Sequence, residues 1–345
     1  MNRRAFLKLS AASALCAGPL AGCRRQQVNH IVWALGWIPD VEYGNLWTAL
    51  DRGFFTQSGA RVDYFPGGPN APQPVVMVAA GEATLGDAEW LPLTDAVLQG
   101  NDFVVIAAQF PILPTGLITL PKRPIRKPKD MVGATFLVQG PSERAELAAT
   151  FSLNKLPMNY KMVPVGFSPE ALLEGQGDAY FCYITNQPRT LEKMGLVKDK
   201  DFFVTPIYDL GYRVPSSLLF VERRMIRDHR EQLVGFLEGL LLARQANFAD
   251  VTLAPRLAAE HYGGDLGLDY EQQLSLNKGQ LLLEREAGRE VPFSFGDDAI
   301  KTLYAAAAAT GRTHLPTPNK LFDLSMLEDA YTRLKQKGAL HVASS

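Results

Sequence analysis

Patterns typical of strands and helices alternate along most of this 345-residue chain, and the alternation limits the folds that it can adopt. Short stretches rich in β-branched and aromatic residues, such as HIVWALGW (30–37) and GATFLVQG (133–140), are followed by amphipathic segments. The alternation runs twice and predicts an α/β architecture with mostly parallel sheet. From Glu222 to about Lys337 the pattern is almost wholly helical.

Two changes in composition predict where the chain passes between lobes. The proline-rich and basic stretch near 118–130 predicts a crossover into a second lobe, and YRVPSSLLFV (212–221) predicts the return. We therefore expect a first lobe over 23–118, a second lobe over 119–215, and a helical return to the first lobe over 216–345.

The first 22 residues have the pattern of an export signal. Arg3 and Arg4 precede an apolar run of about a dozen residues, which is too short to span a bilayer as a mature helix. The arginine pair with Ala5–Lys8 resembles a bacterial twin-arginine signal, and LAGC, ending at Cys23, resembles a lipobox. We expect a protein of the periplasm or cell envelope, held at a membrane by a lipid on Cys23. The alternative is a plain cleaved signal with an incidental cysteine.

Charge and cysteine content exclude several classes. Removal of residues 1–22 leaves 32 basic and 36 acidic side chains, a net charge near −4, so an extended nucleic-acid footprint is not expected. Once Cys16 leaves with the signal and Cys23 carries lipid, only Cys182 remains inside the fold, and no disulfide is available there. No further segment is long and apolar enough to span a membrane.

The sequence contains no recognisable catalytic motif. The five histidines have no metal-ligand spacing, and there is neither a phosphate-binding glycine loop nor a G-x-S-x-G turn. Cys182 lies inside a strand pattern, where a small buried residue is the simpler interpretation. The acid pairs Asp40/Glu42 and Asp87/Glu89 are typical of helix caps and exposed turns. We predict no catalytic residue, cofactor or metal site.

Four turns combine aromatic and hydrogen-bonding side chains, and each is expected at the carboxyl end of a strand. In an open parallel sheet this edge binds ligands, and the helices that begin there offer free backbone N–H groups. Nine side chains in these turns are the candidates for ligand binding: Trp37, Asp40, Tyr43, Glu89, Trp90, Gln139, Ser142, Tyr183 and Asn186.

Several segments resemble the periplasmic substrate-binding proteins of ABC importers, in the group related to thiamine-pyrimidine precursor uptake and synthesis. WIPD (37–40) and RGFF (52–55) match that group's Trp-x-Pro-Asn turn and its basic-Gly-aromatic-Phe run. VVMVAAGEATLGDAEW (75–90), IRKPKDMVGATFLV (125–138) and the helix over 227–249 also match. The resemblance implies a type II fold of two α/β lobes with a hinge and an interlobe cleft. It also implies a monomer that passes a small solute to a permease and its ATPase.

We predict the following roles for the candidates. Trp37, Tyr43, Trp90 and Tyr183 would wall an aromatic ring; Asp40, Glu89 and Asn186 would hydrogen-bond to it; and Gln139 and Ser142, with Ser142 as helix cap, would bind a carbonyl or anion. Asp40 stands where the group often has asparagine, and Tyr43 where it has histidine.

A carboxylate in that turn favours a planar heteroaromatic ligand with donors, such as an aminopyrimidine. One alternative is a sulfonate, taurine or nitrate. Another is a pyrimidine-synthase type of enzyme, whose cysteine cluster this chain lacks. For Asp40 a role as cap alone stays open, as do a turn-shaping role for Asn186 and an interior position for Tyr183.

Overall fold

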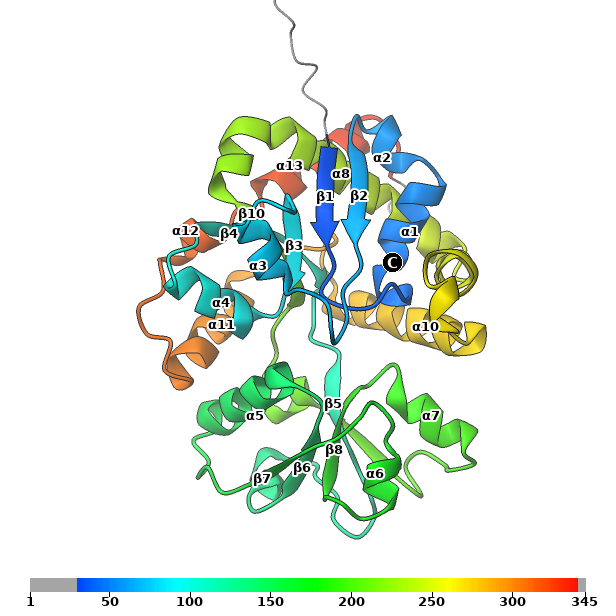
Figure 1. The fold of residues 1–345 in the computed structure, drawn as a ribbon, viewed down its shortest axis with the longest axis vertical. Helices are drawn as coiled ribbons and strands as arrows, with labels where there is room; N and C mark the ends of the chain where they lie inside the picture. Colours follow the sequence, from blue (N-terminus) through cyan, green and yellow to red (C-terminus); the bar gives the residue numbers. More distant parts are fainter. Residues whose placement is uncertain (1–29, 341–345) are drawn as a thin grey trace, which may run out of the picture.

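Ten strands form two five-stranded sheets, one in each of two lobes, in the computed structural model of residues 30–340 (Figure 1). The expected export signal and Cys23 lie outside the described residues. Sheet A, in lobe 1, contains β1 (His30–Ala34), β2 (Arg61–Phe65), β3 (Leu85–Ala88), β4 (Phe103–Phe110) and β10 (Ser216–Glu222). Sheet B, in lobe 2, contains β5 (Thr115–Thr119), β6 (Thr135–Val138), β7 (Lys161–Pro164), β8 (Ala179–Tyr183) and β9 (Phe203–Pro206). The predicted two-lobed α/β fold is confirmed.

The prediction of mostly parallel sheet is confirmed, because four of the five strands in each sheet run in the same direction. The strand orders are β2-β1-β3-β10-β4 and β7-β6-β8-β5-β9, and in each sheet one strand, β10 or β5, runs antiparallel to both neighbours. A parallel neighbour needs a crossover of a dozen or more residues, usually a helix. β5 and β10 instead follow directly on the passages between the lobes.

The chain passes from sheet A to sheet B between Phe110 and Thr115, and it returns between Pro206 and Ser216. β5 therefore lies in sheet B, slightly before the expected crossover near 118. The limits 23–118, 119–215 and 216–345 stay predictions for the lobes as folding units.

Helices cover both faces of sheet A, because successive side chains of a strand point to opposite faces. Trp33 packs with Leu46, Trp47 and Phe236 on one face. That face is covered by α1 (Gly44–Asp51), α2 (Phe54–Gln57), α8 (Arg223–Ala249) and α13 (Ser325–Gln336), with α9 (Leu253–Leu257) beside α1 and α10 (Tyr270–Ala287) against α9. The other face is covered by α3 (Pro74–Ala79), α4 (Trp90–Leu98), α11 (Asp297–Ala309) and α12 (Pro318–Leu321). α8 is kinked at His229, where φ is −141° and ψ is 31°.

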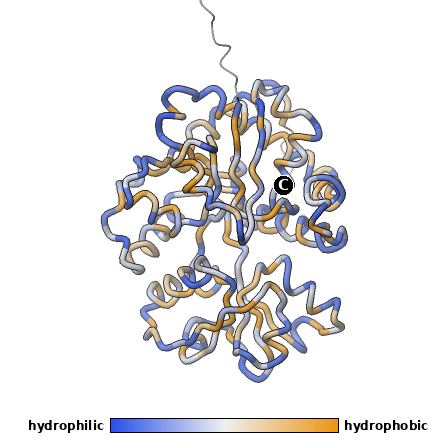
Figure 2. Tube along the Cα trace, in the orientation of Figure 1, coloured by the Kyte–Doolittle hydropathy of each residue, from blue (hydrophilic) through white to orange (hydrophobic). Residues whose placement is uncertain are grey.

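Lobe 2 is smaller and has one helical layer on each side of its sheet. α5 (Pro141–Leu153) packs on one side, while α6 (Glu170–Leu173) and α7 (Gln187–Lys193) lie on the other (Figure 1). The core that includes Phe136 and Phe151 continues into lobe 1 through Tyr212 and Val214 in the return passage. Hydrophobic residues accordingly follow the strands of both lobes, and hydrophilic residues dominate the outer loops (Figure 2). Among the described residues no helix has the length and apolar character needed to cross a membrane.

Candidate functional site

The turn after β1 carries the first candidates. Asp40 caps the 3-10 turn η1 (Val41–Tyr43), where its Oδ1 accepts a hydrogen bond from Glu42 N at 2.8 Å. Its backbone carbonyl accepts a second bond from Trp47 Nε1 at 2.6 Å. Burial raises the pKa of the Asp40 carboxyl to about 7. Asp40 thus does cap the turn that leads into α1, and it does so as a buried group.

Glu42, which the sequence analysis treated only as a possible cap, is a buried acid in the same turn. Its carboxylate has no hydrogen-bond partner within residues 30–340. Burial raises the pKa of this carboxyl well above its usual range, and the charges of Asp40, Asp87 and Glu89 raise it further. Glu42 is therefore a polar group that nothing in the described chain satisfies.

The carboxylate of Asp87 stabilises the turn after β1 by accepting hydrogen bonds. It accepts them from Trp33 Nε1 at 2.8 Å, Gly36 N at 3.1 Å and Tyr43 Oη at 3.2 Å, and burial raises its pKa to about 6. The Tyr43 hydroxyl also accepts a bond from Trp37 N at 2.9 Å. Tyr43 is buried edge-on against Trp33, so its contacts support the turn rather than form a wall for a ligand.

Glu89 and Trp90, at the end of β3, have different surroundings. Glu89 Oε1 accepts a bond from Ser217 N at 3.3 Å, and burial raises the pKa of Glu89 to about 7. Trp90 is buried inside lobe 1, where Nε1 donates to the Leu303 carbonyl at 2.6 Å and the ring stacks on Phe322. These contacts give Trp90 a packing role and lend no support to ligand stacking.

The start of α5 differs from the prediction. Gly140 is the N-cap, Pro141 is the first helical residue and no side chain caps the helix, so the expected Ser142 cap is wrong. A proline already suits this position, because its missing N–H would have no partner there. Gln139 is held to its own sheet, with Nε2 donating to the Phe181 carbonyl at 3.0 Å.

Two further acids, Glu143 and Glu146, follow on one face of α5, three residues apart. Glu146 Oε2 accepts a bond from Thr115 Oγ1 at 2.8 Å, whereas Glu143 Oε2 is buried without a partner among the described residues. Burial raises the pKa of both carboxyls, and the charge of Glu89 in lobe 1 raises that of Glu146 further. Sequence reasoning missed both, because acids on a helix face are usually solvated.

Tyr183, at the end of β8, lies among acids of both lobes. Burial raises the pKa of its phenol well above the usual range, and so do the charges of Glu42, Glu89, Glu146 and Glu143. Its hydroxyl has no hydrogen-bond partner in the described part of the chain. We call the four glutamates around Tyr183 the interlobe acid cluster. The one basic contributor to their pKa shifts is Arg144, beside Glu143.

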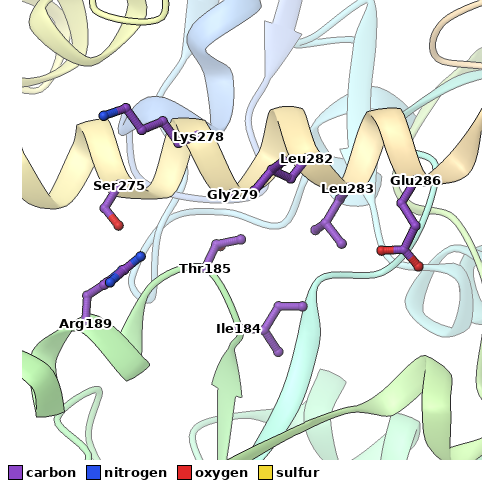
Figure 3. Close-up of a pocket in the computed structure, with 9 residues that line it drawn as sticks. All are labelled: Ile184, Thr185, Arg189, Ser275, Lys278, Gly279, Leu282, Leu283 and Glu286. Atoms are coloured by element: carbon purple, nitrogen blue, oxygen red, sulfur yellow. The ribbon is translucent and has the colours of Figure 1, made fainter. Parts of the chain in front are cut away.

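The lobes also touch along a seam between α10 and the turn after β8. Asn186 Oδ1 accepts a bond from Gln272 Nε2 at 2.5 Å, and Lys193 pairs with Asp269 at 2.8 Å. A pocket of about 260 Å³ lies on this seam, with Ile184, Thr185 and Arg189 of lobe 2 facing α10 (Figure 3). The Asn186 side chain is therefore engaged across the lobes rather than only in its own turn.

The arrangement has the chemistry of a binding site for a hydrogen-bond donor. Buried carboxyls are costly to ionise unless a donor or cation satisfies them. Within residues 30–340 no group of three or more His, Cys, Asp or Glu side chains is placed to hold a metal ion. Cys182 is buried and its thiol pKa is raised by that burial, which makes it unreactive. Of the nine candidates, Asp40, Glu89 and Tyr183 lie close enough to Glu42 for their charges or pKa values to affect one another.

Known proteins share this fold and one family model matches the chain. The model described as NMT1/THI5 like matches residues 41–250. The periplasmic aliphatic sulphonate binding protein SsuA from Escherichia coli has a TM-score of 0.63 at 14% identity, covering 86% of this chain and 91% of that one. A ligand binding component of an ABC-type import system from Staphylococcus aureus has a TM-score of 0.61 at 11% identity, covering 87% and 99%.

The fold also occurs in an enzyme. The desulfurization enzyme DSZB has a TM-score of 0.59 at 15% identity, covering 88% of this chain and 99% of that one. No curated protein sequence matches the chain. At these identities the likeness to solved structures concerns the fold alone.

Proposed function

Because this chain belongs to the NMT1/THI5-like family, whose model matches more than half of it, we propose that it is the extracytoplasmic solute-binding component of an ABC importer. It captures a small planar heteroaromatic compound with hydrogen-bond donors, of the thiamine pyrimidine precursor kind, and delivers it to a permease and its ATPase. A lipid on Cys23 holds the protein, a monomer, at a membrane of the cell envelope.

The observation that carries the proposal is the interlobe acid cluster around Tyr183. Glu42 and Glu89 come from lobe 1, and Glu143 and Glu146 come from lobe 2. Closure of the lobes brings these carboxyls together, and like charges in a buried site repel. A ligand with amino groups would satisfy the carboxyls, and it would therefore favour the closed arrangement over the open one.

Aromatic side chains add a preference for a flat ligand. Trp37 lies half-buried at the mouth of the acid-bearing turn, and the Tyr183 ring lies within the acid cluster. Rings of this kind bind other aromatic rings by stacking or edge contacts. Donors on a flat ring would then select the ligand, because a buried acceptor left unpaired is costly.

A second candidate ligand is a sulfonate, because proteins that bind sulfonates have this fold. The same cluster argues against it, since an anion would meet like charge at any ionised carboxyl of Glu42 or Glu89, and Arg144 is the one basic side chain that lowers a pKa within the cluster. The fold of a desulfurization enzyme likewise raises an enzymatic candidate. Cys182, the one cysteine of the described residues, is buried and does not suit the role of nucleophile.

Calorimetry with 4-amino-2-methylpyrimidine and with taurine separates the two ligand classes. We expect heat of binding with the aminopyrimidine and none with taurine. Tight taurine binding would overturn the proposal. Native mass spectrometry of the purified protein, which weighs any small molecule that co-purifies, provides an unbiased second measurement.

A further inference from the structure

Helix α10 contacts both the acid-bearing turn of lobe 1 and the turn after β8 in lobe 2. Gln273 Oε1 accepts a hydrogen bond from Val41 N at 2.9 Å and so fixes η1. Gln272 donates from Nε2 to Asn186 Oδ1 at 2.5 Å and to the Asn186 carbonyl at 3.3 Å. Gln273 therefore holds Val41, the neighbour of Glu42 in lobe 1, while the adjacent Gln272 holds Asn186 in lobe 2.

Gly279 lets α10 approach lobe 2 closely. A Cβ atom at this position would lie 3.0 Å from Thr185 Cβ and only 2.5 Å from Thr185 Cγ2, and the second distance is closer than a real Cβ atom approaches a non-bonded atom. Gly279 is seven residues, or two turns, beyond Gln272, so both lie on one face of the helix. Figure 3 shows Gly279 directly above Thr185. Glycine inside a helix is normally less stable than alanine by about 0.5–1 kcal/mol, and here it permits the contact between lobes.

We propose that Gln272, Gln273 and Gly279 form a latch on α10 that couples the acid-bearing turn to closure of the lobes. When the lobes separate, the Gln272–Asn186 bond and the Gly279–Thr185 contact are lost together. The exposed Lys193–Asp269 ion pair is lost as well, but such pairs contribute little. The latch opposes the repulsion within the acid cluster, and it thereby sets how much of the ligand-free protein is closed.

This inference rests on the proposed function only for its consequence in binding. A ligand that pairs with Glu42 orders η1, and Gln273 transmits that order to α10 through Val41. α10 then holds Asn186 through the neighbouring Gln272. The latch residues are positioning residues, because they act through these partners and not through the ligand.

Small-angle X-ray scattering of the ligand-free protein tests the latch without any ligand. We expect Gln272→Ala and Gly279→Val each to increase the radius of gyration. Glu271→Ala is a matched control, because its side chain is exposed on the same helix and forms no hydrogen bond or ion pair with the described part of the chain. Gly279→Ala is the milder variant if the valine prevents folding. Scattering of the latch variants identical to that of the wild type would overturn the proposal.

Two further readouts separate the latch from the proposed function. Gln273→Ala should speed hydrogen exchange of the Val41 amide, which loses its acceptor, while leaving the Gln272 contact in place. With 4-amino-2-methylpyrimidine as probe, Gln272→Ala should weaken binding by about two- to tenfold, the range of one neutral hydrogen bond. Absence of aminopyrimidine binding to the wild type would refute the ligand assignment but not the latch, which the scattering decides. Unchanged exchange at Val41 would refute the coupling through Gln273.

Discussion

Trp37 of lobe 1 meets Phe167 of lobe 2 edge to face, with ring centroids 5.3 Å apart and an interplanar angle of 71°. Trp37 follows β1, and Phe167 follows β7, so the pair joins the lobes at a different place from the α10 seam. Phe167 is 50% exposed, and the ring contact that it makes is with lobe 1 rather than with its own lobe. The contact therefore contributes to closure more than to the stability of lobe 2.

Phe167→Ala should weaken ligand binding with little loss of stability. An aromatic pair contributes about 0.5–1.5 kcal/mol beyond its buried area, which corresponds to about a two- to tenfold change in affinity. Calorimetry with the aminopyrimidine measures the first effect, and thermal unfolding measures the second. Met194→Ala is a matched control, since Met194 is a similarly exposed apolar residue of lobe 2, at 46%. A melting temperature that falls much further than in the control would place Phe167 in the core instead.

The ligand-free protein should be more stable at pH 5 than at pH 8. Burial raises the pKa of Asp40 and Glu89 to about 7 and that of Asp87 to about 6, above the ordinary values near about 4. Between pH 4 and pH 7 the folded protein thus binds more protons than the unfolded chain, and stability falls as pH rises. Each group contributes up to about 1.4 kcal/mol per pH unit in that window. Urea unfolding at several pH values measures the slope, and a rise in stability from pH 5 to pH 8 would contradict it.

Glu42→Gln should stabilise the ligand-free protein at pH 8 and weaken binding of a donor ligand. The amide removes one charge from the acid cluster, whose other members raise the pKa of Glu42. At pH 5 the raised pKa values leave more of these carboxyls protonated, so the variant should differ less from the wild type in melting temperature than it does at pH 8. Glu82→Gln, at an exposed position, is the control for loss of a charge elsewhere. Tighter aminopyrimidine binding by the Glu42 variant would speak against a carboxylate contact with ligand.

The positions of the acid-bearing turns were predictable from sequence, because strand ends are marked by local patterns. Asp40 and Glu89 stand directly after strand patterns, where a parallel sheet places its ligands. Trp33, inside a strand pattern, and Trp47, in the amphipathic segment that follows, are both fully buried in the core. Two parallel pairs in each sheet keep this geometry, although β5 and β10 run the other way.

The rest of the site depends on which surfaces meet, which local patterns do not encode. Glu143 and Glu146 read as an ordinary polar helix face until α5 is packed against lobe 1. Gln272 and Asn186 are 86 residues apart, and nothing in either segment points to the other. The sequence places Trp90 in a turn, where it could contact a ligand. In the structure, Leu303 and Phe322 from the helical part of the chain after Glu222 pack around it.

Trp90 and Trp37 should respond differently to substitution, although the sequence suggested the same role for both. Trp90→Phe leaves the Leu303 carbonyl without the indole donor and reduces the volume of a buried ring, so we expect a loss of about 1–3 kcal/mol in the free energy of unfolding. Aminopyrimidine affinity should stay within about twofold of the wild type, because the ring packs against Phe322 inside lobe 1.

Trp37→Ala should show the opposite pattern, since its side chain is half-buried and its ring contacts Phe167 of lobe 2. Its backbone N–H, which donates to the Tyr43 hydroxyl, is unaffected by the change, so the turn keeps its support from Asp87. Denaturation and calorimetry on the same two samples separate the roles. Equal losses of affinity in both variants would contradict the packing role of Trp90 and would indicate that its ring contacts the ligand. The ligand would then have to bind in lobe 1 at a greater depth than the turn after β1.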